Sequence, residues 1–127
     1  YVEDCFHEND LEGWSLMMEG FGNDIDVVAD DLTVTKLQYV KEYLGLYNSC
    51  ILKVNQVGTV SGLVETIRFC KKNNIKTVVS QRSGETDSNM LPHLAVGFGA
   101  DYMKAGAPAR ERIVKYNELL RIQDNFK

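Results

Sequence analysis

Short apolar runs alternate with longer amphipathic stretches along the whole chain, and this alternation limits the possible folds more than any other feature. The short runs are rich in β-branched residues, as in IDVVA and KTVVS, which is typical of buried strands. The longer stretches place apolar residues three or four positions apart, which is typical of helices that pack on one side. Strand and helix alternate about five times, and this predicts parallel βα units. The expected strands are residues 1–3, 25–29, 49–54, 76–80 and 100–104, and the expected helices are residues 11–21, 37–46, 63–70, 91–98 and 111–122.

The spacing of the polar residues at the expected strand ends narrows the architecture. Glu3, Asp30, Lys53, Arg82 and Lys104 follow one another at intervals of 22 to 29 residues. A closed barrel of eight βα units has roughly 250 residues, or about 31 per unit, so the intervals are close to those of a barrel. Five units cannot close such a barrel, which leaves two architectures open: an open doubly wound sheet, or the larger part of a barrel. Because the chain starts without Met and within an expected strand, we expect it to belong to a longer protein.

Composition and charge exclude several classes of protein. The chain has 127 residues, 44% of them hydrophobic and 25% charged, which fits one globular domain and excludes disorder as its main state. No apolar run approaches the roughly 20 residues of a transmembrane helix. The net charge is −4 and the basic residues are scattered, so we expect no nucleic-acid partner. Three cysteines without a CxxC motif predict free thiols in a reducing cytosol.

Acidic residues follow two successive expected strands, where parallel folds place their functional groups. Glu3 and Asp30 would offer hard oxygen ligands from separate strand ends, and such ligands suit Mg²⁺. The alternative is that these acids cap the next helix. For the neighbouring Asp4 and Asp31 taken singly, capping is the simpler interpretation. For Glu3 and Asp30 together, both interpretations stay open.

Cations follow or end the remaining strands. Lys53 lies in an otherwise apolar strand, and a lysine partly removed from water loses its proton more readily, as a general base must. Alternatively, it reaches the rim or pairs with an acid. A guanidinium, a hydroxyl and a glycine that permits close backbone approach follow one another at Arg82, Ser83 and Gly84, which fits a phosphate site. For these residues alone, an exposed loop with a helix cap is the simpler interpretation. Lys104 ends the next strand, and together with Arg82 it favours an anionic substrate.

Several stretches of the sequence resemble the enolase family, in the same order and over nearly the whole chain. They are VADDLTVT (28–35), LKVNQVGTV (52–60), SQRSGET (80–86), KAGAPAR (104–110) and KYNELLRI (115–122), and YVEDCF at the start is similar to a strand end of that family. The resemblance implies an α/β fold, the C-terminal portion of an enolase-type TIM-like barrel with about five βα units. Residues 1–127 would then be a partial C-terminal barrel domain, without the N-terminal domain and the first barrel strands.

The resemblance also implies an activity, phosphopyruvate hydratase. This carbon–oxygen lyase of glycolysis and gluconeogenesis reversibly dehydrates 2-phosphoglycerate to phosphoenolpyruvate. Glu3 and Asp30 would be two of three carboxylate ligands of the cofactor Mg²⁺. Lys53 would contact the substrate and, as the general base, remove the proton next to the substrate carboxylate.

The remaining site residues are implied in the same way. Arg82 and Ser83 would hold the substrate phosphate, Gln81 would also contact the substrate, and Ser83 would also reach a second metal ion. Lys104 would contact the substrate carboxylate. At full length the protein would be a cytoplasmic homodimer with a small-molecule substrate.

Two departures from the family pattern leave an alternative open. Gln81 stands where the family has histidine, and glutamine forms hydrogen bonds but has no titrating imidazole. The catalytic acid and the third metal ligand of the family belong to a part outside this chain, so we expect the chain alone to be an incomplete catalyst. The alternative is a non-catalytic enolase-like structural or binding protein. The retained Glu3, Asp30 and Lys53 argue against it. A different acid substrate is a third possibility, which the RSGET and KAGAPAR stretches disfavour.

Overall fold

All five strands run parallel, and each pairs with the next strand in the sequence. The computed structural model of the chain describes residues 1–126. The strands are β1 (Val2–Glu3), β2 (Val27–Ala29), β3 (Ser49–Leu52), β4 (Lys76–Ser80) and β5 (Tyr102–Lys104), in the order β1-β2-β3-β4-β5. A doubly wound sheet reverses its strand order partway, whereas this order continues in one direction. The structure therefore confirms part of an α/β barrel and excludes the open doubly wound sheet.

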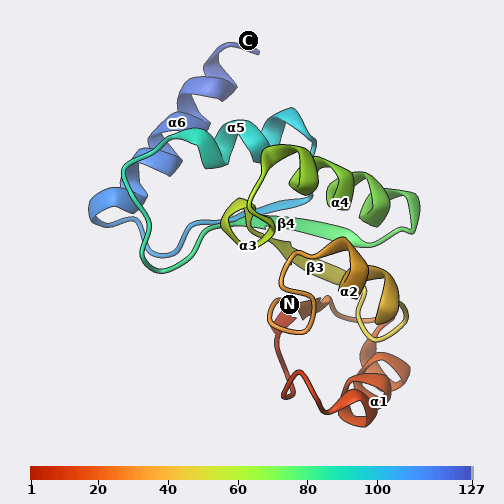
Figure 1. The fold of residues 1–127 in the computed structure, drawn as a ribbon. Helices are drawn as coiled ribbons and strands as arrows, with labels where there is room; N and C mark the ends of the chain where they lie inside the picture. Colours follow the sequence, from red (N-terminus) through yellow and green to blue (C-terminus); the bar gives the residue numbers. More distant parts are fainter. Residues whose placement is uncertain (127) are drawn as a thin grey trace.

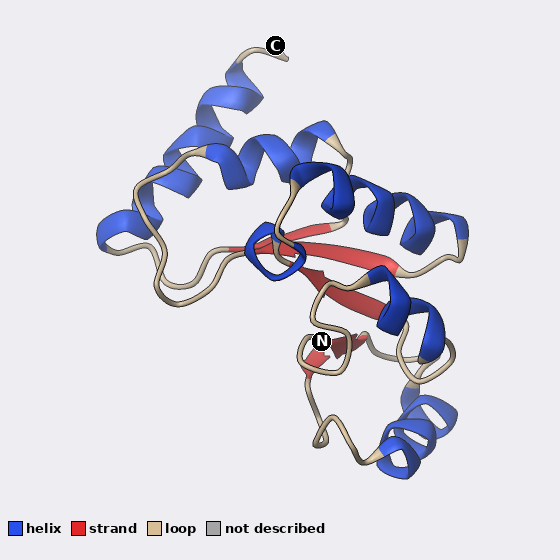
Figure 2. Cartoon of the chain, in the orientation of Figure 1, coloured by secondary structure: helices blue, strands red, loops and turns tan. Residues whose placement is uncertain are grey.

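Helices connect the strands and lie around one side of the sheet (Figures 1 and 2). They are α1 (Leu11–Phe21), α2 (Leu37–Glu42), α3 (Val54–Val57), α4 (Val60–Lys72), α5 (Met90–Gly97) and α6 (Ile113–Asp124), with a 3-10 turn, η1 (Arg110–Arg112), before α6. The sequence predicts all of these except α3 and η1. Helix α4 begins earlier than expected because Thr59 caps it, its Oγ1 accepting the N–H of Gly62 at 3.1 Å. Within residues 1–126, no helix is both long enough and apolar enough to cross a membrane.

Alternate strand positions point toward the helices and form the main core. Ala29 of β2 and Leu52 of β3 are fully buried there, together with Trp14 of α1 and Leu63 of α4. The indole N–H of Trp14 donates to the carbonyl of His7 at 3.2 Å, so its polar atom is satisfied as well. The expected apolar spacing of these helices therefore corresponds to burial against the sheet.

The opposite side of the sheet is curved inward, so that its two edge strands face each other. The rings of Tyr1 and Tyr102 lie edge to face with centroids 6.4 Å apart, although β1 and β5 are at opposite edges of the sheet. A second buried cluster lies on this inner side and consists of Val28, Ile51 and Val78. The curvature is that of a partial barrel.

Helices α5 and α6 are joined by a charged cluster around Glu118. This carboxylate accepts hydrogen bonds from Arg121 at 2.5 and 2.9 Å and from His93 Nε2 at 2.6 Å. Arg121, followed by His93, holds the pKa of Glu118 at about 2, far below the usual value near 4.5. A carboxyl group whose pKa is lowered by folding stabilises the folded state above its unfolded pKa, and that contribution is lost as the pH falls toward the folded pKa.

Replacing Glu118 with Gln should therefore lower the free energy of unfolding at neutral pH. The difference from the wild type should shrink as the pH falls from about 5 to about 2. Urea unfolding at a series of pH values measures both effects. Glu65→Gln is the control, because Glu65 is an exposed residue of α4 that forms no ion pair within residues 1–126. A pH-independent difference for Glu118→Gln would contradict the prediction.

Candidate functional site

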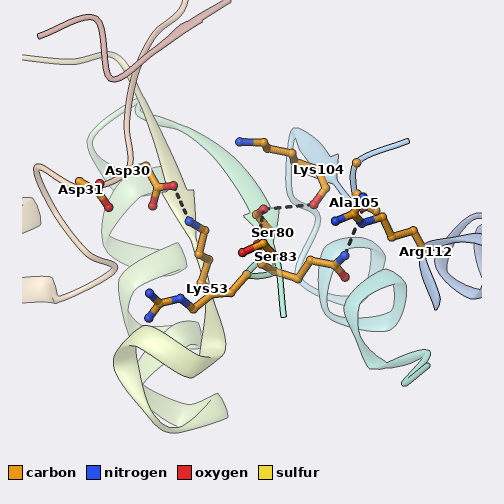
Figure 3. Close-up of a pocket in the computed structure, with 11 residues that line it drawn as sticks. Asp30, Asp31, Lys53, Ser80, Ser83, Lys104, Ala105 and Arg112 are labelled. Atoms are coloured by element: carbon orange, nitrogen blue, oxygen red, sulfur yellow. Dashed lines mark hydrogen bonds and ion pairs between the residues drawn. The ribbon is translucent and has the colours of Figure 1, made fainter. Parts of the chain in front are cut away.

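A cavity of about 420 Å³ opens at the carboxyl ends of the strands (Figure 3). It brings together residues that are far apart in the sequence: Asp30, Asp31, Lys53, Ser80, Gln81, Arg82, Ser83, Lys104, Ala105, Gly106 and Arg112. All the site residues expected from the sequence line this cavity except Glu3, which accepts hydrogen bonds from the lining residue Lys104. Four of the lining side chains are cations and two are acids, so the lining favours an anionic ligand.

Lys53 and Asp30 form a largely buried ion pair in this cavity (Figure 3). The ammonium of Lys53 donates to Oδ2 of Asp30, and the two side chains are only 12% and 9% exposed. Strand β3 ends at Leu52, so Lys53 follows the strand and precedes α3, instead of lying within a strand as expected. The sequence left open whether Lys53 is a general base or a lysine that pairs with an acid, and in the structure it pairs with Asp30. This pairing also brings the ammonium into the cavity, where a base would have to act.

The turn after Asp30 is strained and holds Lys53 in place. Val34 and Thr35 both have left-handed backbones, with φ of +41° and +59°, which β-branched residues rarely adopt. The conformation directs the buried Thr35 hydroxyl toward two partners: it accepts the N–H of Lys53 at 2.9 Å and donates to Gln56 Oε1 at 2.6 Å. Such strain is often found at functional sites. Thr35 was not expected as a site residue from the sequence, although it lies within the VADDLTVT stretch.

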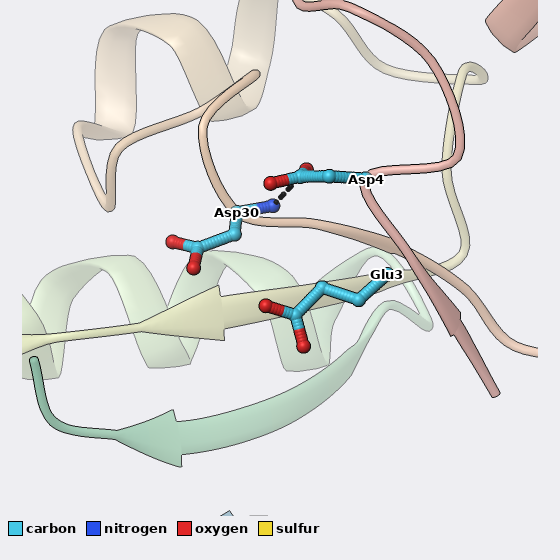
Figure 4. Close-up of side chains that lie close together, drawn as sticks. All are labelled: Glu3, Asp4 and Asp30. Atoms are coloured by element: carbon cyan, nitrogen blue, oxygen red, sulfur yellow. Dashed lines mark hydrogen bonds between the residues drawn. The ribbon is translucent and has the colours of Figure 1, made fainter. Parts of the chain in front are cut away.

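Three carboxylates gather beside the cavity (Figure 4). Glu3, Asp4 and Asp30 each have an oxygen within 4.8 Å of the others. Asp4 accepts the backbone N–H groups of Asp30 and Asp31 at 2.9 and 3.1 Å. Burial raises the pKa of the Asp4 carboxyl, and these two hydrogen bonds partly oppose the rise. Asp4 thus fixes the turn after β2. The expectation that it caps the next helix is wrong, because Asp10 caps α1.

The donor set of these three residues fits a divalent metal ion, since hard cations prefer carboxylate oxygens. In the structure, however, two of the carboxylates already have cationic partners. Both oxygens of Glu3 accept hydrogen bonds from Lys104 Nζ, at 2.7 and 2.6 Å, and Asp30 is paired with Lys53. A metal ion would therefore compete with two ammonium groups for its ligands.

The loops after β4 and β5 form the other end of the cavity and are held to each other. Ser80 Oγ donates to the Lys104 carbonyl at 3.1 Å, and Gln81 Nε2 donates to the Ala105 carbonyl at 3.2 Å. The other amide atom of Gln81, Oε1, is buried and has no partner within residues 1–126. A buried acceptor without a partner is costly, so a ligand or a water molecule with a donor would be favoured there. Arg82 and Ser83 follow in the same loop.

Arg112 is a cation of the site that the sequence analysis missed. It belongs to η1, and its side chain lies against Gly106, where a Cβ atom would come within 3.2 Å of Arg112 Cδ. Gly106 has φ of +80°, so a residue with a side chain would be both strained and crowded at this position. The arginine lies in the expected last helix, and its spacing alone gave no sign that it reaches the cavity.

Comparisons with known proteins agree with this geometry. The family described as "Enolase, C-terminal TIM barrel domain" matches residues 1–127. The chain is 46% identical to an enolase of Sulfurisphaera tokodaii over 131 residues, which cover 99% of this chain and 31% of that protein. It is 42% identical to an enolase of Ureaplasma parvum over 129 residues (99% and 29%) and 41% identical to one of Neorickettsia sennetsu over 128 residues (98% and 31%). The chain therefore spans about a third of the length of these curated relatives.

Replacing Lys104 with Met should strengthen Mg²⁺ binding to the 127-residue chain by about tenfold. The substitution removes the ammonium that a metal ion would have to displace from Glu3, and it removes positive charge close to the three carboxylates. Isothermal titration calorimetry with Mg²⁺ measures the change. Lys76→Met is a matched control, because Lys76 pairs with Asp26 at 2.6 Å at the amino ends of the strands. Unchanged or weaker binding by Lys104→Met would argue against Glu3 as a ligand.

Proposed function

Because the chain belongs to the enolase family, we propose that it carries the C-terminal part of a site that interconverts 2-phosphoglycerate and phosphoenolpyruvate. The observation that carries the proposal is the single cavity that unites Asp30, Lys53, Arg82, Ser83 and Lys104 from four neighbouring strand ends. The chain spans about a third of its relatives, so the reaction is proposed for the whole protein. Residues 1–127 would supply one part of its barrel domain.

Lys53 is the proposed general base. To take the proton next to the substrate carboxylate, its amine must be neutral and must leave Asp30, to which it donates in the structure. The second requirement is met when Asp30 acquires another partner, because its carboxylate oxygens are then no longer available to the ammonium of Lys53. The fixed position of the Lys53 backbone, held by Thr35, supports proton removal at a defined point in the cavity.

Glu3 and Asp30 are the proposed ligands of Mg²⁺, with Asp4 beside them. When bound, Mg²⁺ would neutralise the negative charge that develops as the proton leaves. Ser83 is the proposed contact to a second metal ion. Arg82, Ser83 and Gln81 are proposed to bind the phosphate, and Lys104 the carboxylate of the substrate.

Removal of the proton next to the substrate carboxylate would create a dianion there. Cations held in fixed positions stabilise such a dianion because they need not reorient during the reaction. The four cations of the cavity lining support this role for an anionic substrate. The cytoplasmic location and the homodimeric state of the whole protein stay predictions from the resemblance.

The alternative function is a non-catalytic enolase-like structural or binding protein. Gln81 favours it, because the amide keeps its hydrogen bond to Ala105 and has no titrating group. The ion pair of Lys53 with Asp30 disfavours it, since a protein without catalysis has no need to bury a cation and a carboxylate together. Turnover distinguishes the two functions.

The first test is phosphoenolpyruvate formation from 2-phosphoglycerate by the native protein that carries this chain, with Mg²⁺ and with a chelator. We expect turnover that the chelator abolishes. Lys53→Ala should lower kcat by about 10²- to 10⁴-fold, the usual contribution of a general base. A folded protein that binds Mg²⁺ but forms no phosphoenolpyruvate would contradict the proposal and favour the non-catalytic alternative.

The substitution Gln81→His tests whether the missing imidazole limits the rate. We expect kcat to rise, by up to about a hundredfold, because a titrating group would join the cations at the anion end of the cavity. Steady-state kinetics over a range of pH should then show an added ionisation. Gln81→Met is the control, since it has similar length but cannot donate to Ala105. An unchanged kcat and pH profile in Gln81→His would show that the imidazole is not limiting.

A further inference from the structure

Lys115 is a charged residue of α6 that the structure buries completely, with 0% of its surface exposed. Its ammonium donates to two backbone carbonyls, those of Thr86 and, at 3.2 Å, Glu111. No carboxylate among residues 1–126 forms an ion pair with it. Lysines are almost never fully buried without a paired charge, because desolvation of the ammonium is costly. Stability alone therefore does not account for a lysine at this position.

The Thr86 carbonyl belongs to the loop of residues 81–89, which joins β4 to α5 and carries Gln81, Arg82 and Ser83. Within residues 82–88, the other hydrogen bonds are local: Thr86 binds Glu85, Ser88 binds Thr86, and the first residue of α5 binds Ser88. The bond from Lys115 is thus the one described hydrogen bond that fastens this stretch to a distant element. The loop depends on α6 for its position.

The next residue of α6 makes the corresponding contact to the other loop of the site. The hydroxyl of Tyr116 donates to the carbonyl of Gly106, in the loop that follows Lys104 and leads to Arg112. Helix α6 itself packs against α5 (Figure 1). Two consecutive side chains in the first turn of α6 therefore hold the loop that carries Arg82 and the loop that lies between Lys104 and Arg112.

We propose that Lys115 is a positioning residue for the anion end of the site, which holds the 81–89 loop so that Arg82 and Ser83 face a bound phosphate. This inference rests on the proposed function, because the phosphate is that of the substrate. The buried ammonium has no carboxylate partner, so its charge also adds to the positive potential at this end of the sheet. The role is indirect, since Lys115 is not among the residues that line the cavity.

The test is calorimetric titration of the native protein that carries this chain with 2-phosphoglycerate in the presence of Mg²⁺. Lys115→Met should weaken binding at least about tenfold, because small displacements of binding groups have effects of that size or larger. Its urea unfolding midpoint should stay close to that of the wild type, since removal of a buried unpaired charge offsets the two lost hydrogen bonds. Lys71→Met is the matched control: Lys71 also donates to a backbone carbonyl, that of Gly99, far from the cavity lining.

Amide hydrogen exchange adds a readout that a purely structural role would not change. In Lys115→Met the amides of residues 83–88 should exchange faster, while those of α6 stay protected. Lys115→Arg keeps a cation at this position and should restore part of the affinity. If the methionine variant does not fold, Lys115→Gln takes its place. Wild-type affinity and unchanged exchange of the loop in that variant would overturn the proposal.

The outcomes separate this inference from the proposed function. A wild-type native protein that binds no 2-phosphoglycerate would overturn the proposed function, and the positioning role with it. A wild-type native protein that binds 2-phosphoglycerate, together with a folded Lys115→Met variant that binds equally well and shows unchanged exchange in the loop, would overturn the positioning role alone. Weaker binding in proportion to a loss of folded protein, with faster exchange throughout α6, would also overturn it, because Lys115 would then be structural.

Discussion

The contact between the first and last strands across the inner side of the sheet determines the geometry of the whole site. Glu3 and Lys104 are 101 residues apart in the sequence and lie at opposite edges of the sheet, yet both oxygens of the glutamate accept from the lysine. The rings of Tyr1 and Tyr102, two residues before Glu3 and Lys104, also meet on this side. Without this inward curvature the strand ends would form a row, and the acids of β1 and β2 would lie far from the cations of β4 and β5.

Charge balance explains how so many ionised groups can share one cavity. Three carboxylates within 4.8 Å of one another would repel strongly if they stood alone. Lys104 and Lys53 each bind one of them, and the third, Asp4, accepts two backbone N–H groups. The same two lysines are those proposed to act on the substrate. The internal ion pairs therefore keep the site assembled and also keep its functional cations near the positions where a ligand would meet them.

The sequence predicts what depends on local pattern and misses what depends on the path of loops. The apolar runs of β2, β3 and β4 were expected because β-branched residues are concentrated there. Helix α3 was missed because four residues are too few for a periodic pattern. Lys115 looks like an ordinary surface lysine of an amphipathic helix, yet it is fully buried and its ammonium donates to the 81–89 loop. Thr35 depends on a left-handed turn that no spacing rule indicates.

The fold alone does not distinguish a catalytic from a non-catalytic site, and Gln81 shows why. Its Nε2 donates to the Ala105 carbonyl, a bond that one nitrogen of an imidazole could also make, so glutamine preserves the link between the loops after β4 and β5. Glutamine and histidine at position 81 differ in their second polar atom. An imidazole offers a nitrogen that can gain or lose a proton, whereas Gln81 offers only the buried, unpartnered Oε1. The substitution therefore leaves the shape of the site intact and alters only its capacity to exchange a proton, which is a property that kinetics over a range of pH measures directly.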